Sequence, residues 1–146
     1  MKLKPVRLLT TSDYSRIVAL WQAAGLHIRP TGRDSEEAFE RQMAGGLQTA
    51  IGIEIENGDL IGVVLVTHDG RKGWINRLAV RPDWRRQGVA KQLITAAEDV
   101  LHQQGIDVIA ALIEPGNTPS LACFLGSGYE EYVGLHYVSK RSRADS

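Results

Sequence analysis

The chain has 146 residues, and its 17 basic and 17 acidic side chains cancel at neutral pH. This length predicts one domain, residues 1–146, with a core of its own. A nucleic-acid-binding protein would usually show a basic excess, which this chain lacks, so a nucleic-acid partner is not expected. A membrane span needs about 18 consecutive apolar residues, and the sequence has no such run, so no contact with a membrane is expected either. The single cysteine, Cys123, excludes an internal disulfide, and the N-terminus lacks the apolar core of a secretory signal, so we expect a cytoplasmic protein.

The spacing of apolar residues predicts an α/β domain with the order β-α-α-β-β-β-α-β-α-β-β. In chain order, the expected elements are a strand over 6–9, helices over 14–24 and 35–45, strands over 49–56, 60–68 and 75–80, a helix over 87–104, a strand over 108–113, a helix over 119–125, and closing strands over 129–133 and 136–140. The Asn57-Gly58-Asp59 turn predicts a hairpin. The continuous apolar run from Val108 to Ile113 predicts a buried strand.

The most informative stretch runs from Trp74 to Ile94 and combines a strand, a basic turn and the start of a helix. Its turn reads Arg85-Arg86-Gln87-Gly88-Val89-Ala90. The first turn of a helix leaves backbone N–H groups unpaired, and the helix dipole adds roughly half a positive charge there. Glycine at position 88 lets an anion approach the backbone. The pattern therefore indicates a binding site for a phosphorylated ligand.

The residues Arg85-x-x-Gly88-x-Ala90 resemble the (Gln/Arg)-x-x-Gly-x-(Gly/Ala) pyrophosphate loop of the GNAT N-acetyltransferases, and Leu78-Ala79-Val80-Arg81-Pro82 is similar to the strand before it. Downstream, Asn117 and then Phe124-x-x-x-Gly128-Tyr129 resemble the family's later Asn…Tyr-x-x-x-Gly-Phe segment. The resemblance implies a GNAT-like fold: a mixed, largely antiparallel sheet with flanking helices and splayed central strands. It also implies acetyl-coenzyme A as the acyl donor. The four histidines show no metal-ligand spacing, so no metal site is expected.

The resemblance also implies how the coenzyme would be held. Backbone N–H groups of the turn would bind the pyrophosphate, while backbone groups of the preceding strand would pair with the pantetheine arm and polarise the thioester carbonyl. Asn117 would contact the pantetheine arm or cap a helix, or both. The expected coenzyme-binding residues are Leu78, Ala79, Val80, Arg85, Arg86, Gln87, Gly88, Val89, Ala90, Lys91, Asn117 and Phe124.

The chain departs from the family at the two positions that most often transfer protons. Phe124 stands where a tyrosine often acts as general acid, and Asn76 stands where many members carry a glutamate. An amine acceptor must lose a proton before it attacks, so a base or a water relay is expected. We expect Glu114 to act as base, with Glu54 and His68 as weaker candidates. The residues that could replace the tyrosine, or that could simply pack, are Tyr129, Tyr132, His136 and Tyr137.

The loop from Leu26 to Asp34 lies where the family walls the acceptor site. Arg29 and Arg33 could bind an acceptor carboxylate or phosphate, and Asp34 an amine, although an ordinary polar loop has the same composition. The expected activity is acetyl transfer from acetyl-coenzyme A to a primary amine of a small molecule, by direct attack in a ternary complex. Two alternatives remain open, a protein N-terminal or lysine acetyltransferase and a non-catalytic acyl-coenzyme A sensor. The oligomeric state is open, with a homodimer among the possibilities.

Overall fold

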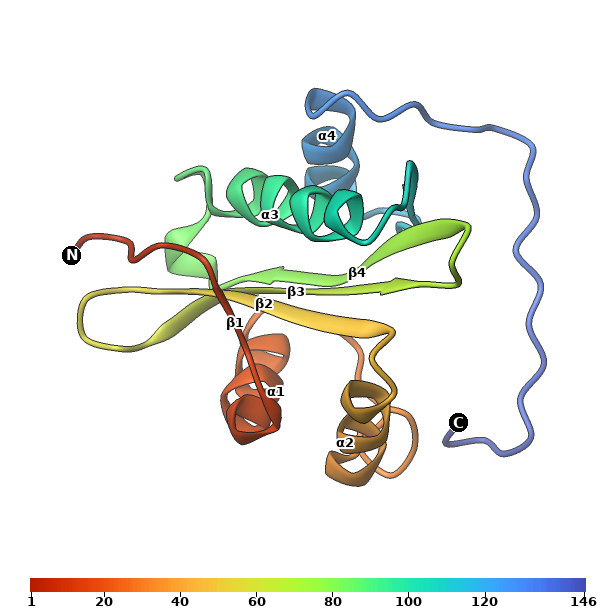
Figure 1. Ribbon diagram of the computed structural model, residues 1–146, viewed down its shortest axis with the longest axis horizontal. Coiled ribbons are helices and arrows are strands. Elements are labelled where there is room, and N and C mark those ends of the chain that lie inside the picture. Colours follow the sequence, from red (N-terminus) through yellow and green to blue (C-terminus); the bar gives the residue numbers. More distant parts are fainter.

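The computed structural model describes residues 1–146 and places a five-stranded sheet between two layers of helices (Figure 1). The sheet has the order β1-β2-β3-β4-β5, in which β5 runs parallel to β4 and all other neighbours are antiparallel. The strands are β1 (Arg7–Leu8), β2 (Gln48–Glu54), β3 (Leu60–His68), β4 (Lys72–Val80) and β5 (Val108–Ala111). The helices are α1 (Tyr14–Ala23), α2 (Glu36–Ala44), α3 (Val89–Gln103) and α4 (Thr118–Gly126), with short 3-10 helices η1 (Thr11–Asp13) and η2 (Pro82–Trp84). The expected mixed, largely antiparallel sheet with flanking helices is confirmed.

The sheet is buried on both faces because helices cover both sides of it (Figure 1). Side chains of β3 alternate between the two cores: Val63 packs in the core above α1 and α2, and the next residue, Val64, packs in the core under α3. This explains why β3 reads as a continuous apolar run. Gly62 lets α3 approach the strand closely, since a Cβ there would lie 2.7 Å from the Val89 side chain. The start of α3, and with it the basic turn, is thereby held directly against β3.

The hairpin between β2 and β3 forms as the sequence predicts. Gly58 has a φ of +93°, and the Asn57 side-chain oxygen accepts a hydrogen bond from the Asp59 N–H at 2.9 Å. Both features stabilise a tight turn. The longest helix, α3, has 15 residues, and none of the helices is long and apolar enough to cross a membrane.

The predicted closing strands over 129–133 and 136–140 are wrong. These residues belong to an extended arm, 130–143, that has no regular secondary structure and follows α4 (Figure 1). Their β-branched and aromatic residues favour a strand, but a strand also needs a neighbour for its backbone groups. No backbone group from 130 to 140 has a hydrogen-bond partner within the chain.

The prediction that 108–113 forms a buried strand is also wrong in part. The strand ends at Ala111, and Val108 is 54% exposed. The physical reason lies in the arm: without the closing strands, β5 is the edge of the sheet and has a neighbour on one side only.

Candidate active site

The turn between β4 and α3 presents a row of free backbone donors. Arg86 and Gly88 both have left-handed backbone conformations, with φ of +64° and +80°. The N–H groups of six consecutive residues, Arg86 to Lys91, have no hydrogen-bond acceptor within the chain. Left-handed residues within such a turn, together with the N-terminus of a long helix, create a concave site for an anion. The backbone of this turn therefore has the geometry that an anion cradle requires.

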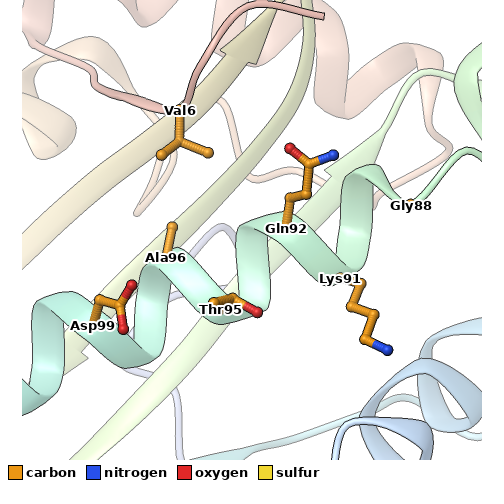
Figure 2. Close-up of a pocket in the computed structure, with 7 residues that line it drawn as sticks. All are labelled: Val6, Gly88, Lys91, Gln92, Thr95, Ala96 and Asp99. Carbon is orange, nitrogen blue, oxygen red and sulfur yellow. The ribbon is translucent and has the colours of Figure 1, made fainter.

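Only some of the nearby cations are available to an anion. Arg81 is paired with Asp83 at 2.7 Å, and Arg85 donates to the carbonyl of Ala24, at the end of α1, at 3.3 Å. Arg86 and Lys91 are exposed and have no partner. Figure 2 shows Lys91 projecting from the first turn of α3, next to Gly88. A surface cavity of about 510 Å³ adjoins this turn, lined by Val6, Gly88, Lys91, Gln92, Thr95, Ala96 and Asp99 (Figure 2).

Beside the turn, β4 and β5 separate. The two strands pair only from Lys72 to Ile75 on β4, whereas β4 continues to Val80. The N–H of Arg81 donates to Ile61 of β3 at 2.8 Å. Because backbone groups in an antiparallel strand alternate in direction, Val80 and Leu78 point theirs away from β3, toward the open side. The splayed strands expected from the family resemblance are present, and they lead to the anion cradle.

A bulge in β4 brings a partly buried arginine to the same region. The pairing of β3 with β4 shifts between Val63 and Leu65, and Arg77 at this shift has a φ of +53°. Its guanidinium lies 4.4 Å from the centre of the Trp21 ring and donates to the carbonyl of His27 at 2.8 Å. Burial lowers the pKa of Arg77, while nearby Asp34 opposes this shift. Arg77 is not among the site residues expected from the sequence, although a charged residue inside an apolar strand is a signal that could have indicated it.

The acceptor loop, 26–34, is fastened to β4 by Asp34. The Asp34 carboxylate lies 3.5 Å from Arg77 and accepts the backbone N–H of Arg29 at 2.7 Å, and the Asp34 side chain is only 10% exposed. Arg29 in turn donates to the carbonyl of Ala144 at 3.3 Å. Arg33 is exposed and has no ion pair. Of the three expected acceptor residues, Arg33 is therefore the one whose side chain makes no hydrogen bond or ion pair, whereas Arg29 and Asp34 make contacts within the chain.

Two of the candidate bases are unsuitable. Glu54 binds Arg7 at 3.0 Å and Arg16 at 2.7 Å, and these hydrogen bonds lower its pKa to about 2. A carboxylate held in this way does not take up a proton near neutral pH. His68 lies at the far end of β3 from the splay, and its Nδ1 accepts the backbone N–H of Gly70 at 3.1 Å. The geometry therefore argues against both Glu54 and His68 as the base.

The aromatic residues around position 124 pack. Phe124 is 4% exposed, and its ring meets Tyr129 edge-on with 5.1 Å between ring centres. The Tyr129 hydroxyl donates to Glu98 at 2.7 Å, and burial raises its pKa well above the ordinary value. Tyr129 is therefore a poor replacement for the missing acid. Tyr132 and Tyr137 lie in the exposed arm.

The remaining candidates are Asn76, in the middle of β4, and two residues that follow β5, Glu114 and Asn117. Asn76 donates its side-chain amide to Thr67 at 3.0 Å, which fixes the side chain against β3. Glu114 is exposed in the turn after β5, where its carbonyl accepts the N–H of Asn117 at 3.1 Å. Asn117 accepts the N–H of Ser120 at 3.3 Å, which confirms that Asn117 caps α4. No group of three or more His, Cys, Asp or Glu residues is arranged to hold a metal ion.

Comparison with known proteins assigns this arrangement to a family. Residues 15–129 match the model of the acetyltransferase (GNAT) family. The fold is similar to AAC(6')-Iy in complex with the bisubstrate analogue CoA-S-monomethyl-acetylneamine, with 20% identity, a TM-score of 0.78 and coverage of 97% of this chain and 99% of that one. It is also similar to glucosamine-6-phosphate N-acetyltransferase from Arabidopsis thaliana (19% identity, TM-score 0.70, coverage 98% and 100%). A third similar structure is the ribosomal-protein-alanine N-acetyltransferase of Brucella melitensis biovar Abortus 2308 (17% identity, TM-score 0.72, coverage 97% and 100%).

These identities establish the fold alone, whereas the family match spans most of the chain and includes β4, the basic turn and α3. The chain therefore belongs to the GNAT family and is an acetyl-coenzyme A-dependent N-acetyltransferase.

Proposed function

We propose that the chain transfers the acetyl group of acetyl-coenzyme A to a primary amine of a small molecule that also carries an anionic group. The observation that carries the proposal is the row of free N–H groups from Arg86 to Lys91, placed where the open side of β4 ends. Backbone donors bind an anion without losing side-chain entropy.

The residues around the turn fit coenzyme A. In the proposal, the N–H groups of Arg86 to Lys91 bind the pyrophosphate, and the Arg86 and Lys91 side chains add charge-assisted contacts. The outward-facing backbone groups of Leu78 and Val80 pair with the pantetheine arm and donate to the thioester oxygen as negative charge develops there. Arg85 supports the turn from outside through its bond to Ala24.

Direct attack in a ternary complex needs no covalent enzyme intermediate. The amine nitrogen forms a bond to the thioester carbon, the carbon–sulfur bond breaks, and the nitrogen loses its proton while the leaving sulfur gains one. Glu114 is our proposed base, through water, because it is exposed at the end of β5, beside the splay. A thiolate with a pKa of about 8.5 leaves without much assistance, so Phe124 in place of a tyrosine is compatible with turnover.

The acceptor class is proposed from charge. A hollow of about 500 Å³ lies between the acceptor loop, α2 and the end of the chain, and five of its lining residues are cationic: Arg33, Arg41, Lys140, Arg141 and Arg143. This charge favours an acceptor with a carboxylate or phosphate. The similar structures are described as acting on different amines, among them glucosamine-6-phosphate and a ribosomal-protein alanine. The fold therefore does not determine the acceptor, and we assign acceptor specificity to the loop over 26–34.

The protein acetyltransferase is the second candidate. A peptide needs an open groove, whereas the acceptor loop is fastened by Arg77 to Asp34 and contacted by Ala144 and Asp145 at the end of the chain. A fastened loop beside the acceptor site favours a small molecule over a peptide.

A non-catalytic coenzyme sensor is the third candidate function, because Phe124 and Asn76 lack the usual proton-transfer groups.

A screen that follows thiol release from acetyl-coenzyme A tests all three. Amino sugars, sugar phosphates, amino acids and peptides would be compared, each with and without an anionic group. We expect turnover with small anionic amines. Best activity on peptides would favour the protein acetyltransferase, and acetyl-coenzyme A binding without transfer to any amine would favour the sensor.

A further inference from the structure

Arg77 has a backbone conformation that suits glycine better than arginine. Its φ is +53°, and Arg77 and Arg86 are the two residues other than glycine with a positive φ. A side chain in the left-handed region is disfavoured, whereas glycine adopts this conformation freely. The Nε of Arg77 is also buried without a hydrogen-bond partner, which is a second unfavourable feature. Glycine at position 77 would avoid both, and strain of this kind is concentrated at functional sites, so the side chain of Arg77 needs a functional explanation.

The Arg77 side chain joins the sheet to helix α1 and to the acceptor loop, 26–34. Its guanidinium lies 4.4 Å from the centre of the ring of Trp21, a residue of α1 that is 2% exposed. Its Nη1 donates to the carbonyl oxygen of His27 at 2.8 Å, and its Nη2 lies 3.5 Å from the Asp34 carboxylate. Arg77 is the only residue of the sheet that hydrogen-bonds this loop. One planar guanidinium therefore holds the loop near both of its ends.

Within the loop, Asp34 extends this contact to the turn that carries Arg33. The Oδ2 of Asp34 faces Nη2 of Arg77 and also accepts the backbone N–H of Arg29 at 2.7 Å. The carbonyl oxygen of Arg29 then accepts the N–H groups of Gly32 and Asp34 at 3.0 and 3.1 Å. These bonds close the turn, so the position of Arg33 depends on Arg77 through Asp34.

Arg77 also lies where the sheet opens. The pairing of β4 with β5 ends at Ile75, and Leu78, whose backbone groups face the open side, follows Arg77 directly. Arg77 therefore borders the coenzyme side of the splay through its backbone and holds the acceptor loop through its side chain.

We propose that Arg77 is a positioning residue for the acceptor: it holds the loop over 26–34 beside the splay, so that Arg33 can receive the anionic group of the acceptor. This inference rests on the proposed function, in which the loop selects the acceptor. Without the Arg77 side chain, the coenzyme turn between β4 and α3 would be unchanged, but Arg33 would no longer have a fixed place relative to β4.

Arg77→Gly is the test, because glycine suits a φ of +53° and the variant should therefore fold. The acceptor used is the best amine from the thiol-release screen. The KM for that amine should rise by about 10- to 150-fold, as expected when a charge-assisted hydrogen bond is lost, and the KM for acetyl-coenzyme A should not change. Arg77→Lys keeps the charge without the planar fork, so its KM for the amine should lie between those of the wild type and Arg77→Gly.

Arg86→Gly is the matched control, because Arg86 is the other arginine with a positive φ, at +64°, and belongs to the coenzyme turn. It should weaken acetyl-coenzyme A binding and leave the KM for the amine unchanged, which is the opposite of the result expected for Arg77→Gly. A rise in both constants for Arg77→Gly would show a general loss of structure and would overturn the assignment.

Asp34→Asn separates an action through the loop from a direct contact between Arg77 and the acceptor. Asparagine can still accept the N–H of Arg29 but removes the ion pair with Arg77. If Arg77 acts through the loop, Asp34→Asn should also raise the KM for the amine, and the double variant should be no worse than Arg77→Gly alone. An unchanged KM for the amine in Asp34→Asn would overturn the positioning role.

Amide hydrogen exchange of the full chain tests the contact without any acceptor. The amides of Arg29, Gly32 and Asp34 are hydrogen-bonded within the loop, and in Arg77→Gly they should exchange at least about tenfold faster than in the wild type. Unchanged exchange would show that Arg77 does not hold the loop. Faster exchange with an unchanged KM for the amine would refute the role in acceptor binding while the proposed function stands. If the screen finds no acceptor, the proposed function fails, and the exchange rates alone decide whether Arg77 holds the loop.

Discussion

Substitution of Gly88 by alanine tests whether the anion cradle depends on the left-handed backbone of the turn. Gly88 has a φ of +80°, and a Cβ added there meets no protein atom within 4 Å. The methyl group therefore collides with nothing in the chain itself. It acts in two ways, by straining a left-handed residue and by occupying the space that a bound pyrophosphate would approach.

The two effects have different magnitudes and different readouts. An alanine in the left-handed region costs about 1–2 kcal/mol, which lowers the free energy of unfolding. If the turn relaxes instead, the N–H groups near position 88 rotate away from the ligand. Each charge-assisted hydrogen bond that is lost contributes about 1.5–3 kcal/mol, so acetyl-coenzyme A binding should weaken by about 10- to 150-fold per bond.

Gly105→Ala is the matched control, because Gly105 follows the other end of α3 with a φ of +81° and equally open space. Both variants should lose similar stability in urea unfolding. Calorimetry with acetyl-coenzyme A should show weaker binding for Gly88→Ala but not for Gly105→Ala. The two variants should bind pantetheine with equal affinity, because pantetheine lacks the pyrophosphate. If Gly88→Ala binds acetyl-coenzyme A as tightly as Gly105→Ala does, the turn does not bind the pyrophosphate and the reasoning is refuted.

Three further predictions concern the base, the acceptor and the buried carboxylate. Glu114→Gln should lower kcat for amine acetylation without changing coenzyme affinity, and an unchanged pH–rate profile would remove Glu114 as base. Arg33→Ala should raise the KM for the acceptor by about 10- to 150-fold and leave the KM for the coenzyme unchanged. If Arg33→Ala has the wild-type KM for the acceptor, the loop only covers the site. Glu54 has its pKa lowered from 4.5 to about 2, so its contribution of up to about 3 kcal/mol is present above pH 4.5 and lost as the pH falls toward 2. Between pH 5 and 2, the free energy of unfolding measured in urea should therefore fall more steeply with pH for the wild type than for Glu54→Gln. If the two proteins lose stability in parallel, the lowered pKa of Glu54 is contradicted.

Phe124 gives a prediction that joins packing to chemistry. Phe124→Ala should lower the free energy of unfolding by about 3–5 kcal/mol, because the ring is 4% exposed and packs on Tyr129. Phe124→Tyr should keep coenzyme binding and keep or raise turnover at neutral pH. Complete loss of activity in a Phe124→Tyr protein that still binds the coenzyme would contradict the role inferred for this position.

Local sequence determines most of the elements and the basic turn, 85–90, of this protein. Helix periodicity, the Asn57-Gly58-Asp59 turn and the strand–turn–helix around Gly88 all depend on neighbours in the chain, so they can be recognised without coordinates. The free N–H groups follow from the start of a helix, which the sequence marks. Asn117 as a cap is a local feature of the same kind.

Only the tertiary structure decides which polar groups remain free. Arg85, Asp34 and Glu54 are ordinary charged residues in the sequence, yet each is occupied by a partner far along the chain: Ala24, Arg77 and Arg7. Arg77 reaches the site because a bulge turns its backbone to a φ of +53°, which depends on pairing with β3. The closing segment has strand propensity but no strand neighbour, because a strand is completed by hydrogen bonds to another segment and propensity alone does not supply that segment.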